Sequence, residues 1–241
     1  EATDYAFNQH PTAISIQIKK AQILTDKGKV NEAIRILDKV ERIESTNFDI
    51  CFLRGSIFLI QRNPTEAIRL FDKSIGLIYE NKEDYLVDIG RILDKYNYSE
   101  EASKYFVKAH KESPEEKNIV FELAFLFEKL NQNEKSIEYY NKYLDIDPFS
   151  ENAWFNLGYC YNRMEKYSDA VDAYNYAIAI DPTFTSAIFN KANCLANDNR
   201  FEESIATYED FLELDDNYAQ AYFYIAECYM KLSKNELAIV Y

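Results

Sequence analysis

The segment ENAWFNLGYCYNRMEKYSDAVDAYNYAIAIDPTF, residues 151–184, decides how the whole chain is organised. Its proline, Pro182, follows Pro148 and Pro114 at steps of 34 residues, and each proline closes a stretch with helical character. Proline disfavours helix at the residue before it and so ends such a stretch. A fixed period of this length is typical of repeat architectures. With proline at position 32, the period predicts repeats over 14–47, 48–82 (35 residues, divergent), 83–116, 117–150, 151–184, 185–218 and, in part, 219–241.

Four columns that were not used to set this register test it. Positions 8 and 20 hold only small residues, and positions 11 and 24 hold only large apolar or aromatic ones. Position 8 is Ala21, Gly55, Gly90, Ala124, Gly158, Ala192 and Ala226, and position 24 is Leu37, Phe71, Phe106, Tyr140, Tyr174 and Tyr208. Chance does not produce such columns, so the repeat is real.

The columns predict two helices in every repeat. Positions 4, 7, 8 and 11 share one face of a first helix, and positions 20, 24 and 27 share one face of a second. Small residues at 8 and 20 let two antiparallel helices approach closely, while large residues at 11 and 24 fill the flanking space. A heptad coiled coil is the alternative, and the 34-residue step disfavours it.

The best repeat carries a recognisable signature. Residues at its signature positions are Trp154, Leu157, Gly158, Tyr161, Ala170, Tyr174, Ala177 and Pro182. This pattern resembles the tetratricopeptide repeat family, and the resemblance covers almost the whole chain, more weakly in the first two repeats. It implies an all-α fold, a right-handed α-solenoid (superhelix) of stacked antiparallel helix pairs.

Both ends of the sequence fall inside a repeat. Residues 1–12, EATDYAFNQHPT, align without a gap to residues 172–183, DAYNYAIAIDPT, so we expect residues 1–13 to be the second-helix remnant of a preceding repeat. The last repeat stops shortly after position 20. Terminal repeats normally carry a polar capping face, which neither end has, so we expect an excerpt of a longer array with possible self-association through uncapped ends.

Composition excludes several classes of function. The formal net charge of −14 argues against nucleic acid, which requires clustered Lys and Arg, and against anionic membrane surfaces. No apolar run approaches the roughly 20 residues of a membrane span. The acidic balance favours a neutral, apolar or basic partner segment over an acidic one.

We expect no catalytic residues, no cofactor and no metal. Cys160, Cys194 and Cys228 all occupy position 10, where a small apolar side chain suits an inter-helix slot. Cys51 falls in another core column. Four free thiols suggest a reducing, intracellular compartment, so we expect a cytoplasmic protein.

In the resembling family, first helices line a concave groove, with positions 2, 5, 6, 9, 12 and 13 pointing into it. Eleven residues at positions 5, 6 and 9 of the last four repeats therefore form the candidate peptide groove: Phe121, Phe125, Phe155, Asn156, Tyr159, Phe189, Asn190, Asn193, Phe223, Tyr224 and Glu227. Rings accept apolar side chains, and Asn carboxamides pair with a peptide backbone. These residue types are also common in the family irrespective of binding, so a consensus without a groove remains the alternative.

The resemblance implies a protein-interaction scaffold that binds a peptide segment or partner protein. The family's clamp for acidic chaperone tails needs a lysine at position 5, and no repeat here has one. A rival hypothesis is that these repeats are the substrate-recognition arm of a larger enzyme. An RNA-reading helical-repeat protein would need a basic groove, which the charge contradicts.

Overall fold

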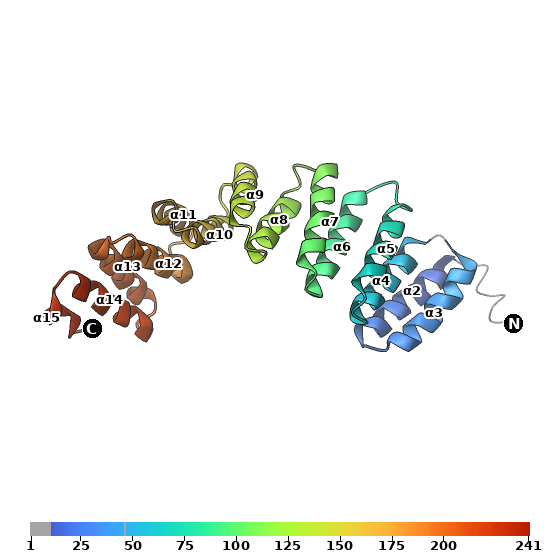
Figure 1. The fold of residues 1–241 in the computed structure, drawn as a ribbon, viewed down its shortest axis with the longest axis horizontal. Helices are drawn as coiled ribbons and strands as arrows, with labels where there is room; N and C mark the ends of the chain where they lie inside the picture. Colours follow the sequence, from blue (N-terminus) through green and yellow to red (C-terminus); the bar gives the residue numbers. More distant parts are fainter. Residues whose placement is uncertain (1–10, 46) are drawn as a thin grey trace. The chain divides into compact units, whose positions relative to one another are not determined.

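The computed structural model describes residues 11–45 and 47–241, and these divide into two compact units. The N-terminal unit is Glu1–Pro114 and the C-terminal unit is Glu115–Tyr241. Throughout the described residues the secondary structure is helical (Figure 1). The expected remnant over 1–13 falls mostly outside the described residues, and its last three residues belong to the first helix, α2.

Each unit is a series of helical hairpins. The N-terminal unit contains α2 (Pro11–Asp26), α3 (Val30–Ile43), α4 (Phe48–Ile60), α5 (Pro64–Ile75), α6 (Lys82–Lys95) and α7 (Ser99–Glu112). The C-terminal unit contains α8 (Lys117–Lys129), α9 (Asn133–Ile146), α10 (Glu151–Arg163), α11 (Tyr167–Ile180), α12 (Thr185–Asn197), α13 (Phe201–Leu214), α14 (Ala219–Lys231) and α15 (Asn235–Ala238). Consecutive helices pack as pairs, and within a unit each pair stacks on the next (Figure 1). The predicted all-α class and its helix pairs are confirmed.

A left-handed residue at position 15 ends the first helix of every repeat. Gly28 occupies this place with φ of +73°. The equivalent residues, all with φ between +57° and +66°, are Arg62, Asn97, Asn131, Glu165, Asn199 and Ser233. The next residue's amide donates back into the helix, as from Lys166 to the Tyr161 carbonyl at 3.0 Å. This is a typical helix C-terminus, in which the left-handed residue turns the chain into the second helix.

The small and large columns pack as the sequence predicts. Ser136 and Ser204, at position 20, each donate a 2.8 Å hydrogen bond to the position-8 carbonyl of the facing helix. A Cβ placed on Gly158 would lie 2.8 Å from the ring of Tyr174, at position 24 of the same repeat. The second helix therefore approaches the first closely at position 20, and the position-24 ring lies against position 8.

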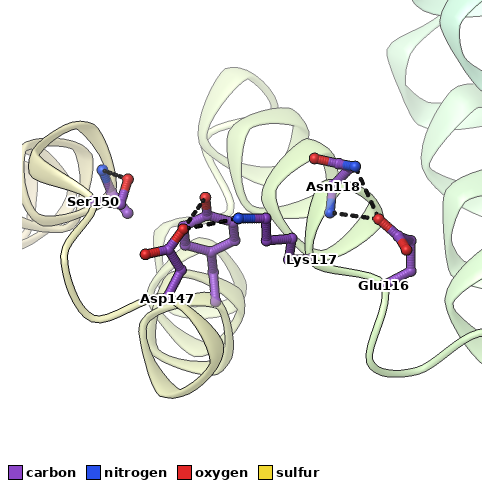
Figure 2. Close-up of polar contacts among 7 residues, drawn as sticks. Glu116, Lys117, Asn118, Asp147 and Ser150 are labelled. Atoms are coloured by element: carbon purple, nitrogen blue, oxygen red, sulfur yellow. Dashed lines mark hydrogen bonds and ion pairs between the residues drawn. The ribbon is translucent and has the colours of Figure 1, made fainter.

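Polar side chains fix the ends of helices in the C-terminal unit (Figure 2). Ser150 accepts a hydrogen bond from the Ala153 amide at 3.3 Å and so caps α10. At the start of α8, the Lys117 ammonium lies 3.0 Å from Asp147, the residue that follows α9. The hydrogen bond and charge of Lys117 lower the pKa of Asp147. This ion pair ties the first helix of the repeat to the end of the second.

Candidate functional site

A pocket of about 470 Å³ opens between helices of the C-terminal unit. It is lined by Asn162 of α10, by Asn190, Asn193, Ala196 and Asn197 of α12, by Phe201 and Tyr208 of α13, and by Tyr224, Glu227, Cys228 and Lys231 of α14. Three consecutive repeats contribute because the first helices lie side by side in the stack. The pocket combines four carboxamides with aromatic walls, so it can hold a polar group between rings.

Two of the carboxamides are held in opposite orientations. The Tyr208 hydroxyl donates to Oδ1 of Asn193 at 2.5 Å, which leaves the Asn193 NH₂ group as the unused end of that amide. Asn190 is the reverse case, because its Nδ2 donates to the Ser186 carbonyl at 2.9 Å and its Oδ1 is left as an acceptor. One donor and one acceptor on neighbouring turns of α12 match the C=O and N–H of a peptide group.

Aromatic side chains form the walls of the pocket. The rings of Tyr208 and Tyr224 stack with centroids 5.8 Å apart. Gln220 donates to the Tyr224 hydroxyl at 2.9 Å, so that oxygen already accepts one bond. Burial raises the pKa of Tyr208, and the nearby Glu227 carboxylate contributes to the same direction. The Tyr208 phenol therefore stays protonated, as its hydrogen bond to Asn193 requires.

Of the eleven residues predicted for the groove, the structure brings four into this pocket: Asn190, Asn193, Tyr224 and Glu227. Two others at position 9, Phe125 and Tyr159, are exposed at 48% and 38% on α8 and α10. Phe223 is also exposed, at 57%.

The position-5 rings have a packing role that the sequence did not reveal. Phe121, Phe155 and Phe189 are half-buried, and each lies against the position-24 tyrosine of its own repeat with centroids 5.6–5.8 Å apart. Phe189 also contacts Tyr224 at 6.0 Å and so supports the pocket wall from behind. Asn156 is half-buried and bonds the Tyr140 hydroxyl.

Several pocket residues were missed because only positions 5, 6 and 9 were collected. Asn162 stands at position 12 and Asn197 at position 13, which belong to the same groove face in the resembling family. Lys231 also stands at position 13. Including positions 12 and 13 in the predicted groove face would have identified these three residues. Phe201 and Tyr208 come from the second helix, and nothing in the first-helix pattern indicates them.

The cysteines are buried and free. Cys160 lies 3.2 Å from the Ser136 hydroxyl, and Cys228 lies 3.6 Å from that of Ser204, in each case across the boundary to the preceding repeat. Burial raises the pKa of Cys160 to about 11 and that of Cys194 to about 12. These thiols therefore have the inter-helix place predicted for position 10 and little thiolate character.

Two other kinds of site are absent from the described part of the chain. Over those residues, no three His, Cys, Asp or Glu side chains converge in a way that could hold a metal ion. No described helix combines the length and the apolar character needed to cross a bilayer.

Comparison with known families finds the same kind of repeat. Three sequence profiles described as tetratricopeptide repeat match residues 118–150, 151–184 and 189–241. No curated protein sequence matches the chain.

Solved structures show the same fold at low identity. MamA protein is 20% identical over 65% of this chain and 86% of its own, with a TM-score of 0.63. YrrB, described as a TPR protein with an unusual peptide-binding site, is 20% identical over 79% of this chain and 98% of its own, with a TM-score of 0.56. The C-terminal part of a TPR repeat-containing protein from Cytophaga hutchinsonii is 17% identical over 92% and 90%, with a TM-score of 0.70.

Proposed function

Because the chain belongs to the tetratricopeptide repeat family, we propose that it is a protein-interaction scaffold without catalysis of its own. Its C-terminal unit binds an extended segment of a partner protein at the pocket between α10, α12, α13 and α14. The segment lies along the first helices, and its main chain meets the Asn side chains of α12.

The observation that carries this proposal is the opposed orientation of Asn190 and Asn193. Oδ1 of Asn190 accepts from a peptide N–H, and the NH₂ group of Asn193 donates to a peptide C=O. Both amides are held by existing hydrogen bonds, so little side-chain freedom is lost on binding. The exposed rings of Tyr159 and Phe223 offer apolar contact to side chains of the same segment.

A random-peptide display library, panned on the whole chain, tests the proposal. We expect enrichment of related sequences that is lost with Asn190→Ala, since this change removes the acceptor while leaving the wall rings in place. Asn217→Ala is the matched control, because Asn217 lies in the exposed turn between α13 and α14 and bonds only its neighbour Asp216. Enrichment that Asn190→Ala leaves unchanged would contradict binding at this pocket.

A further inference from the structure

The acidic charge of the protein is concentrated in one unit. Residues 1–114 carry 17 Lys and Arg against 18 Asp and Glu, a net charge of −1. Residues 115–241 carry 10 against 23, a net charge of −13, and the two values together give the −14 of the chain. The unit that contains the pocket therefore has a strongly negative field, which attracts basic segments and repels acidic ones.

Within that unit, one carboxylate lines the pocket. Glu227 stands on α14 at position 9 and is exposed. It forms no ion pair with any described residue, and Lys231, one turn further along α14, stays outside ion-pair distance. Burial raises the pKa values of Tyr208 and Cys228, and Glu227 adds a smaller contribution in the same direction. Glu227 is the one acidic side chain among the residues that line the pocket, and Lys231, which is also exposed, lines it too.

The walls suit a flat cation. Tyr224 and Phe201 line the pocket with half-buried rings, on which a guanidinium can stack. Tyr208 is fully buried and stacks against Tyr224. The carboxamides of Asn162 and Asn197 supply further oxygen acceptors around the same space. A guanidinium has five N–H donors and no acceptor, so it can use a carboxylate and several amide oxygens at once.

We propose that this pocket is a specificity site for an arginine side chain of the bound segment, with Glu227 as its ion-pair partner and Tyr224 and Phe201 as its walls. The inference rests on the proposed function, because Asn190 and Asn193 hold the main chain of the same segment. Lysine fits less well than arginine, since its compact ammonium cannot stack as a plane and offers three donors where a guanidinium offers five. Lys231, which also lines the pocket, opposes the ligand and limits its affinity.

Synthetic versions of the peptides enriched from the display library provide the probe. We expect one position to be arginine, and its replacement by citrulline, the neutral isostere, to weaken binding to the whole chain by about tenfold or more. With Glu227→Gln the same replacement should cost less than about threefold, because the ion pair is already gone. Lys231→Gln should tighten binding. Glu213→Gln, an exposed carboxylate on α13 outside the pocket, is the charge-matched control and should leave the citrulline effect unchanged.

The outcomes separate the two proposals. Enriched peptides that depend on Asn190 but lack a required arginine would overturn the arginine site and leave peptide binding standing. A citrulline effect of equal size with and without Glu227 would also overturn it. Failure of the library to yield any enriched peptide would overturn both.

Discussion

The three tyrosines at position 24 of consecutive repeats differ in one respect, the partner of the hydroxyl group. Tyr140 donates to the Glu128 carboxylate at 3.1 Å, and Tyr208 donates to Asn193 at 2.5 Å. The hydroxyl of Tyr174 is buried and has no hydrogen-bond partner. All three side chains are fully buried, so a Tyr→Phe change at each removes one oxygen from the same kind of packing environment.

The change in the free energy of unfolding depends on the hydrogen bond that each hydroxyl group makes. A hydrogen bond to a charged group contributes about 1.5–3 kcal/mol and one to a neutral group about 0.5–1.5 kcal/mol. Tyr140→Phe should therefore lower the free energy of unfolding most, and Tyr208→Phe should lower it less. Tyr174→Phe removes a buried polar atom that makes no bond, so stability should be unchanged or raised by up to about 1 kcal/mol.

Guanidinium unfolding followed by far-UV circular dichroism and by the fluorescence of Trp154 measures this order. Trp154 is the only tryptophan and lies in the same repeat as Tyr174, so its signal reports the relevant region. Because stacked repeats need not unfold in one step, the two probes must coincide before a single free energy is derived. A loss of stability in Tyr174→Phe as large as that in Tyr208→Phe would refute the reasoning.

Three further outcomes are expected. Cys160 and Cys194 should react with a thiol-labelling reagent at pH 8 only after unfolding, because their raised pKa values, about 11 and 12, keep them protonated; rapid native labelling would contradict this. Because the folded protein favours the protonated thiols, their contribution to the free energy of unfolding is fully present below pH 9. This contribution is lost as pH rises through the pKa values of the folded state. Glu165→Gly should raise the free energy of unfolding by about 1 kcal/mol, because Glu165 holds a left-handed backbone with φ of +57°; a lower denaturation midpoint would oppose it. Lys117→Gln should raise the pKa of Asp147 toward its ordinary value in an NMR titration, and an unshifted curve would show that the ion pair is absent in solution.

The helix pairs could be predicted from the sequence because shape imposes strict residue types. Only a small residue fits at position 8 against the position-24 ring, as the contact between Gly158 and Tyr174 shows. Every repeat therefore has a small residue at position 8. The left-handed residue at position 15 was harder to foresee. Gly28 indicates it, but Glu165 does not, since the turn is imposed there by the helices on either side.

The residues of the candidate groove could be predicted only in part, for a different reason. Aromatic residues suit both a binding surface and a packing contact, so sequence alone could not separate Phe223, which is exposed, from Phe189, which lies against Tyr208. The hydrogen bonds that orient Asn190 and Asn193 depend on Ser186 and Tyr208. Tyr208 lies on the neighbouring second helix, which the groove pattern does not cover.

Hydroxyl–thiol contacts are present at two of the three junctions between repeats of the C-terminal unit. Ser136 contacts Cys160, and Ser204 contacts Cys228, whereas the corresponding place between these pairs holds Ala170 and Cys194, which belong to one buried cluster with Tyr174. The junction at Ala170 and Cys194 therefore lacks the hydroxyl–thiol contact that the two flanking junctions have. We therefore expect amide protons beside this junction to exchange with solvent faster than those at the two flanking junctions. The C-terminal unit would then open first at this junction.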